Sequence, residues 1–107
     1  FQTIDEALSM PIDAVVICTP TSSHFEYIKN VSKYTKNIFV EKPMAATLDQ
    51  AKEISKIASE KSLNIQVGFI ERFNPAVQQL KKVLDLSNRV INIDFTRTNK
   101  LSSRIID

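Results

Sequence analysis

Runs of apolar residues along the chain predict three strands of one kind. Residues 12–18 end in five consecutive apolar positions, Ala-Val-Val-Ile-Cys, and shorter apolar runs follow at 37–40 and 64–68. A continuous apolar run, in contrast to an alternating one, is typical of a parallel strand that is covered on both faces. We therefore predict three buried parallel strands.

Apolar residues at helical spacing predict the segments between these strands. Phe25, Ile28 and Val31 form one stripe, which predicts a helix that ends near Tyr34. A second stripe lies in a predicted helix over 48–61, whose inward residues are Leu48, Ala51, Ile54, Ile57 and Ala58. The chain thus places an amphipathic helix after each of the first two strands.

Capping residues mark where the helices begin. The tetrapeptides at 3–6 (Thr-Ile-Asp-Glu) and 47–50 (Thr-Leu-Asp-Gln) both fit a capping box, in which the threonine hydroxyl accepts a hydrogen bond from the amide three residues later. Asn74 followed by Pro75 is a strong start signal for a further helix. The candidate N-caps of the helix after the first strand are Thr21, Ser22 and Ser23.

The order of these elements predicts the fold class. Helix and strand alternate with short connections, which is the rhythm of an α/β fold with a right-handed parallel sheet. Residues 90–98 differ, because apolar and polar residues alternate there and predict a strand with one face in water. We place a domain boundary just before Asn74, so that this strand begins a second α/β domain with an open, largely antiparallel sheet.

Composition narrows the classes of function. The net charge is +2, and Phe95 is the one aromatic residue among six basic ones in 81–107, so nucleic acid is not an expected partner. No apolar stretch approaches the roughly 18 residues of a membrane span, so we expect a cytoplasmic protein without a membrane partner. Cys18 is the only cysteine, and its place at the end of an apolar run predicts burial in the core.

Glycine usage limits any nucleotide site. Gly68 is the only glycine, so the phosphate-binding fingerprint Gly-x-Gly-x-x-Gly cannot lie in this chain. A role in nucleotide binding must therefore use other parts of a binding fold, or be completed by sequence outside the chain.

Polar residues follow each predicted strand, where ligands bind in open parallel sheets. Lys42 comes directly after the second strand and before Pro43, so its side chain starts from a restricted backbone position. A lysine fixed in this way could exchange a proton with a substrate hydroxyl. The alternative interpretation is a surface lysine paired with Glu41.

Three short motifs in this order resemble one known family. They are Thr-Pro-x-x-x-His at 19–24, Glu-Lys-Pro at 41–43 and Gly-Phe-x-x-Arg-Phe-x-Pro at 68–75. The combination resembles the Gfo/Idh/MocA oxidoreductases and covers nearly the whole chain. In that family a Rossmann domain binds NAD or NADP, and a second α/β domain holds the substrate and the oligomer contacts.

The resemblance implies a role for each matching residue. Residues 1–73 would form the C-terminal half of the dinucleotide-binding domain, and 74–107 the first helix and strand of the substrate and oligomerisation domain. Lys42 would be the catalytic lysine, and no metal ligand is implied. The implied cofactor-binding residues are Thr19, Pro20, Thr21, His24, Glu41, Lys42, Pro43 and Arg72.

Several of these assignments have alternatives. A histidine on the surface of a helix would also account for His24, and an ion pair with Glu71 or Glu41 would account for Arg72. The family often has asparagine where this chain has Ser22 and Ser23. Asn74 is a helix cap in preference to a ligand.

The resemblance also implies what the protein acts on. The sequence around Arg72 resembles that of the branch that oxidises nucleotide sugars such as UDP-N-acetylglucosamine at the 3-hydroxyl. We thus expect a fragment of an NAD(P)-dependent sugar or nucleotide-sugar oxidoreductase, inactive as this isolated chain and a homo-oligomer in the parent protein. The alternative is a self-associating interaction domain that has lost the cofactor and pairs through its open strand edges.

Overall fold

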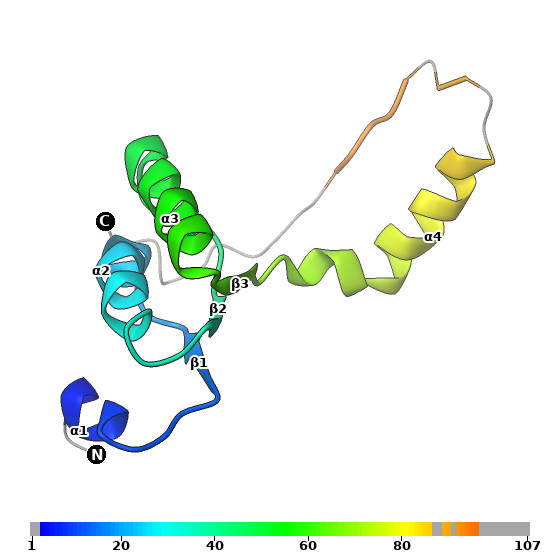
Figure 1. Ribbon diagram of the computed structural model, residues 1–107. Helices are drawn as coiled ribbons and strands as arrows, with labels where there is room; N and C mark the ends of the chain where they lie inside the picture. The colour runs from blue at the N-terminus through cyan, green and yellow to red at the C-terminus, as the bar shows by residue number, and fades with distance from the viewer. Residues whose placement is uncertain (1–2, 87–88, 91, 97–107) are drawn as a thin grey trace, which may run out of the picture. The chain divides into compact units, whose positions relative to one another are not determined.

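The computed structural model describes residues 3–86, 89–90 and 92–96, in two compact units. The first unit comprises residues 1–70 and the second residues 71–107 (Figure 1). The prediction that these parts belong to a cofactor domain and a substrate domain stays a prediction.

A parallel sheet of three strands forms the centre of the first unit. The strands are β1 (Ala14–Ile17), β2 (Asn37–Val40) and β3 (Asn64–Val67), in the order β1-β2-β3. Both pairings are parallel, and the last residues of the three strands, Ile17, Val40 and Val67, are in register. The predicted α/β fold with a parallel sheet is confirmed, and each connection returns the chain to the same end of the sheet.

Helices cover one face of this sheet. The helices α1 (Ile4–Leu8), α2 (Thr21–Val31) and α3 (Leu48–Lys61) alternate with the strands. Helix α2 contacts β1, β2 and α3, and α2 and α3 lie side by side in Figure 1. The buried apolar side chains between the helices and the sheet are Leu8, Ile17, Ile28, Val31, Ile38, Val40 and Ile54.

The predicted threonine caps are confirmed. The Thr3 hydroxyl accepts from the Glu6 amide, and the Thr47 hydroxyl accepts from the Gln50 amide, each at 3.2 Å. In a capping box the Gln50 side chain would accept from the Thr47 amide. Here its Oε1 accepts from the Ala46 amide instead, at 3.1 Å. Local hydrogen bonding therefore fixes where α1 and α3 begin.

The predicted caps of α2 are wrong. Pro20 occupies the N-cap position without a side-chain cap, and Thr21 is the first helical residue. The hydroxyl of Ser23 instead lies 2.8 Å from the Thr19 hydroxyl and 2.8 Å from the Pro20 carbonyl oxygen. The proline lets the helix start one residue earlier than the hydroxyl residues indicated, because its fixed φ suits the entry to a helix.

Coverage of β1 on both faces is also not observed. Val16 is 65% exposed and Cys18 is exposed, whereas Ile17 between them is buried. Side chains alternate between the two faces of a strand, and only the face towards α2 is covered here. The prediction that Cys18 is buried is therefore wrong.

Leu48 is the one residue of the predicted α3 stripe that lies outside it. Its side chain is 69% exposed, whereas Ile54 is 1% exposed. At 3.6 residues per turn, Leu48 lies about 120° around the helix axis from Ile54, which is beyond the buried face. The other members, Ala51, Ile57 and Ala58, are partly buried.

The described part of the second unit contains one long helix. Helix α4 (Pro75–Asp85) begins as predicted, since Asn74 Oδ1 accepts from the Ala76 amide at 3.0 Å and Pro75 is the first helical residue. A 3-10 turn, η1 (Ile70–Phe73), precedes it. Residues 90 and 92–96 form no strand, because no described residue pairs with their backbone. The predicted antiparallel sheet is thus not observed, and residues 91, 97 and 98 of the predicted strand lie outside the described residues.

Among the described residues, no helix is both long enough and apolar enough to cross a membrane.

Candidate active site

Three loop segments meet at the carboxyl edge of the sheet. Because Ile17, Val40 and Val67 are in register, the residues that follow them start side by side. The Glu41 amide donates to the Ile17 carbonyl oxygen at 2.9 Å, and the Gly68 amide donates to the Val40 carbonyl oxygen at 2.9 Å. The sheet ladder therefore continues one residue past the strands and holds the start of each loop.

Lys42 lies at the centre of this edge, directly after Glu41. Its side chain is exposed, and the structure records no ion pair between it and any described residue, Glu41 included. Its backbone amide donates to Glu41 Oε2 at 3.2 Å, and the Lys42–Pro43 peptide bond is cis. The predicted alternative of a Lys42–Glu41 surface pair is thus not observed, and the ammonium group is available to a ligand.

Gly68 allows the Glu41 side chain to take this position. A β-carbon at residue 68 would lie 3.1 Å from Glu41 Oε1 and 3.1 Å from Phe39 Cζ. Both contacts are tighter than ordinary van der Waals separations, so only glycine accepts them without a shift. A lone glycine at the end of a strand was the signal for this residue, since glycine in a strand often marks a close approach of another group.

His24 connects two of the three loops. Its side chain is 1% exposed, and its ring nitrogens lie 2.9 Å (Nδ1) from the Pro43 carbonyl oxygen and 2.8 Å (Nε2) from the Thr19 carbonyl oxygen. The alternative of a histidine on a helix surface is therefore wrong. Both ring nitrogens already have partners in the protein, so neither is left for a cofactor.

Thr19 and its neighbours form the loop after β1. The Thr19 side chain is partly buried and contacts the Ser23 hydroxyl, and Thr21 opens α2 with a partly buried side chain. Ser23 was predicted only as a cap, whereas the structure gives it the contact that orients the Thr19 hydroxyl. The signal in the sequence would have been the spacing of Thr19 and Ser23, two hydroxyl residues that lie four positions apart on either side of the helix start.

Arg72 belongs to a different part of the chain. It lies in η1, next to Glu71, and its side chain is exposed. Residues 71–107 form the second unit, whereas Lys42 lies in the first. The role of Arg72 at a cofactor or substrate stays a prediction.

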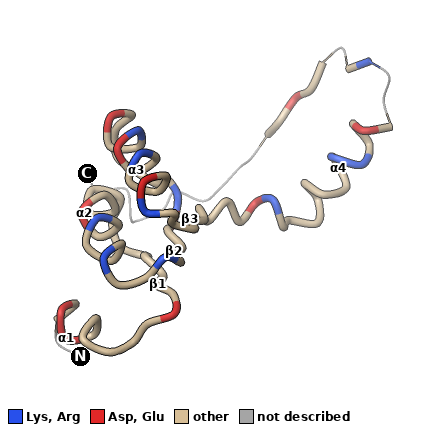
Figure 2. The backbone as a smooth tube through the Cα atoms, viewed as in Figure 1, with Lys and Arg blue, Asp and Glu red and all other residues tan. Residues whose placement is uncertain are grey.

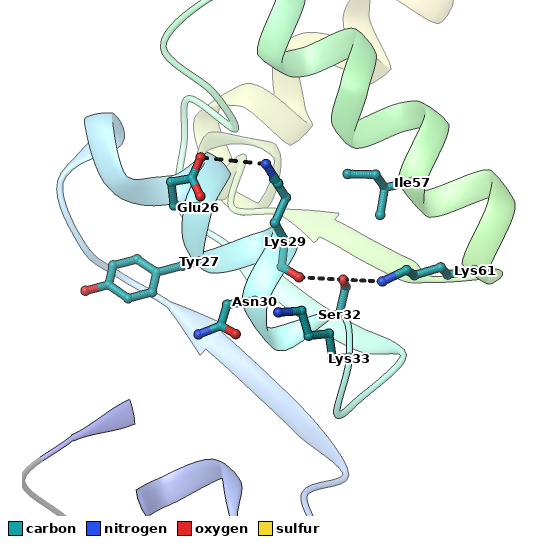
Figure 3. A pocket seen from close by; sticks show the side chains of 8 residues that line it. All are labelled: Glu26, Tyr27, Lys29, Asn30, Ser32, Lys33, Ile57 and Lys61. Carbon is teal, nitrogen blue, oxygen red and sulfur yellow. Dashed lines mark hydrogen bonds and ion pairs between the residues drawn. The ribbon is translucent and has the colours of Figure 1, made fainter. Parts of the chain in front are cut away.

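A hollow of the first unit lies away from this edge. It has a volume of about 450 Å³, and the side chains around it come from α2, α3 and the turn after α2 (Figure 3). Within it the Lys61 ammonium donates to the Ser32 hydroxyl at 3.1 Å, and that hydroxyl donates to the Lys29 carbonyl oxygen at 2.8 Å. Ser32 precedes β2 and Lys61 precedes β3, so the hollow lies near the amino ends of the strands.

Charge on the first unit follows the helices. The three strands contain no charged residue, whereas acidic and basic residues are interspersed along α2 and α3 (Figure 2). Lys29 approaches Glu26 at 3.9 Å and Glu53 at 4.0 Å, and it lies over the Phe25 ring. The charges around this helix pair are therefore partly balanced by ion pairs, whereas no ion pair of Lys42 is recorded among the described residues.

The comparison with known families decides the family. Residues 1–69 match the Gfo/Idh/MocA model, which describes an oxidoreductase family with an NAD-binding Rossmann fold. The chain belongs to this family. The matched residues contain the whole three-stranded sheet together with Thr19, His24, Glu41 and Lys42.

Similar proteins include dehydrogenases of several substrates. The chain is 43% identical over 81 residues to scyllo-inositol 2-dehydrogenase (NAD(+)) of Bacillus subtilis, covering 75% of the chain and 24% of that protein. It is 34% identical over 82 residues to UDP-N-acetylglucosamine 3-dehydrogenase of Acidithiobacillus ferrooxidans, covering 77% and 26%. A solved structure of the latter enzyme matches with a TM-score of 0.69 at 32% identity, over 78% of this chain and 27% of that one. The chain thus spans about a quarter of the length of the relatives it matches.

Proposed function

We propose that this chain is part of an NAD(P)-dependent oxidoreductase that acts on a hydroxyl group of a cyclic polyol or sugar. The observation that carries the proposal is the position of Lys42. It is an exposed ammonium without an ion pair among the described residues, on an anchored loop at the carboxyl edge of a Rossmann-type sheet. Ligands of open α/β sheets bind at this edge.

The residues at this edge fit the nicotinamide end of the cofactor. Thr19, Glu41 and Lys42 offer hydroxyl, carboxylate and ammonium groups next to one another at the strand ends, as ribose hydroxyls and a carboxamide require. We propose that Pro20, Thr21 and Pro43 complete the contacts of the first unit with the cofactor. The phosphate groups need a glycine-rich loop, which the single glycine of this chain cannot form.

In the proposed chemistry Lys42 exchanges the proton of the substrate hydroxyl. A bound nicotinamide supplies the hydride acceptor when the substrate is oxidised. Lys42 Nζ would take the proton of the hydroxyl on the carbon that loses the hydride, so that the C–O bond of the substrate would become a carbonyl. In the reverse direction the Lys42 ammonium returns the proton to the carbonyl oxygen.

The proposed substrate class rests on the similar proteins. Their names include dehydrogenases of inositols and of UDP-N-acetylglucosamine, which share a ring that carries secondary hydroxyl groups. The higher identity is to the scyllo-inositol enzyme, whereas the sequence around Arg72 resembles the nucleotide-sugar branch. We therefore propose the shared class, a ring with secondary hydroxyls.

The experiment that tests the function uses the full-length protein that carries this chain. It is mixed with NAD⁺ or NADP⁺ and with scyllo-inositol, myo-inositol or UDP-N-acetylglucosamine, and reduced nicotinamide is followed by its absorbance. Glycerol, an acyclic polyol, is the matched control. We expect reduction with at least one ring substrate and none with glycerol.

The opposite result would favour the alternative. A full-length protein that reduces neither cofactor with any ring substrate, and that binds neither cofactor in a fluorescence titration, contradicts the oxidoreductase. Self-association of such a protein would then support an interaction domain that pairs through open strand edges.

A further inference from the structure

His24 joins the two loops on either side of the proposed cofactor site. Its ring lies in α2, yet its hydrogen bonds reach the backbone after β1 at Thr19 and the backbone after β2 at Pro43. Both contacts are short, 2.8 and 2.9 Å, and the ring is buried at 1% exposure. One side chain therefore holds the two loops at a fixed separation, and we call this contact the His24 link.

The chemistry of the link requires an imidazole. Each ring nitrogen faces a backbone carbonyl oxygen, which accepts hydrogen bonds and donates none. The ring nitrogen that carries the N–H therefore donates to one of the two loops, and the tautomer decides which loop it is. Histidine is the one side chain that places two nitrogen atoms on opposite sides of a rigid ring.

The link acts on Lys42 through the backbone. On the N-terminal side the Glu41 amide is bound to Ile17, and the Lys42 amide is bound to the Glu41 carboxylate. On the C-terminal side the carbonyl of Pro43 is bound to His24. The Lys42 side chain has no ion pair among the described residues, so these backbone contacts are what set the point from which it projects.

We propose that His24 is a positioning residue that fixes Lys42 for proton exchange and does not itself touch the cofactor. The proposal rests on the proposed function of Lys42 and deepens it, by naming the residue that makes the loop rigid. It replaces the predicted cofactor contact of His24 with a contact to the loop that carries the catalytic lysine. Misplacement of a reacting group by about 1 Å can cost on the order of 100-fold in rate, so rigidity of this loop matters to turnover.

Two variants of the full-length protein test the link. His24→Phe keeps a planar ring and removes both ring nitrogens, and His24→Gln keeps one N–H donor group. We expect kcat to fall by about 10- to 100-fold in His24→Phe, with a smaller loss in His24→Gln and little change in the KM of the cofactor. In the same proteins, hydrogen exchange of the peptide that covers residues 41–45 should become faster in the same order.

A matched control separates positioning from general loss of stability. Ser32→Ala removes a buried hydroxyl at the other end of the same helix region, where it contacts Lys29 and Lys61. We expect this variant to unfold more easily, but to keep wild-type kcat and wild-type exchange at residues 41–45. A fall in kcat of the same size in Ser32→Ala would overturn the proposal.

The wild-type protein gives an independent measurement if the variants do not fold. In a proton–nitrogen NMR spectrum the ring N–H of His24 should exchange slowly with solvent, and an N–H that exchanges as fast as that of a histidine in an unfolded peptide would overturn the link. Lys42→Ala separates the two proposals. If Lys42→Ala retains turnover, the proton-exchange role of Lys42 fails, and the positioning role of His24 fails with it; if His24→Phe changes neither kcat nor exchange while Lys42→Ala is inactive, the link fails and the role of Lys42 stands.

Discussion

The carboxylate of Glu41 lies against the α-carbon of Gly68, so that a β-carbon there would stand 3.1 Å from Glu41 Oε1. The same carboxylate accepts the hydrogen bond of the Lys42 amide. Position 68 therefore controls the backbone of Lys42 by steric means, as His24 does by hydrogen bonding. Because Gly68 has no side chain, the Glu41 carboxylate has room to accept the hydrogen bond of the Lys42 amide.

A larger residue at position 68 should disturb this arrangement. Gly68→Val would place carbon atoms against both Glu41 and Phe39, so we expect it to lower the free energy of unfolding by about 1–3 kcal/mol, as overpacking does. Urea denaturation measures the change. The control is Gln66→Val, which adds the same side chain at an exposed position of β3 and should change stability by less than about 0.5 kcal/mol. Equal effects of the two variants would contradict the close approach.

Truncations in α3 test which of its apolar residues belong to the core. Ile54 is 1% exposed and packs in the core, so Ile54→Ala should lower the free energy of unfolding by about 2–5 kcal/mol. Leu48 is 69% exposed, and Leu48→Ala should change the free energy of unfolding by less than about 0.5 kcal/mol. Thermal unfolding of both variants checks the difference, and a large loss in Leu48→Ala would show that its side chain is covered in the folded protein.

The cap of α3 gives a prediction about local hydrogen bonding. Thr47→Ala removes the oxygen that accepts from the Gln50 amide, and should lower the free energy of unfolding by about 0.5–2 kcal/mol. Ser55→Ala removes a hydroxyl from an exposed position inside the same helix, where alanine is the better helix former, and should cost nothing. If the two substitutions have the same effect in urea denaturation, the cap does not stabilise the helix.

Local signals made most helices and strands of both units predictable. Three helices are capped by hydrogen bonds that span two or three residues, from Thr3, Thr47 and Asn74. Such contacts depend only on residues that are neighbours in the sequence. The parallel sheet followed from apolar runs at the three strands. The position of Lys42 at the edge followed from the rule that loops after parallel strands share one end of the sheet.

Contacts between distant residues were not predictable in the same way. The exposure of Val16 and Cys18 depends on what packs on each face of β1, and a run of apolar residues does not predict this. The His24 contact with Pro43 spans 19 positions, and the residues between them carry no pattern that announces it. The motif drew attention to His24, but only its burial and its two backbone partners distinguish positioning from ligand binding.

The most direct test of the central claim is the kcat of the full-length protein with Lys42→Ala, measured as reduction of nicotinamide with a ring substrate. Loss of the group that exchanges the proton should lower kcat by about 10²–10⁴-fold. The control, Lys36→Ala, removes an exposed lysine just before β2, at the opposite end of that strand, and should leave kcat at the wild-type value. Wild-type turnover in Lys42→Ala would contradict the account, because the proton would then have another carrier.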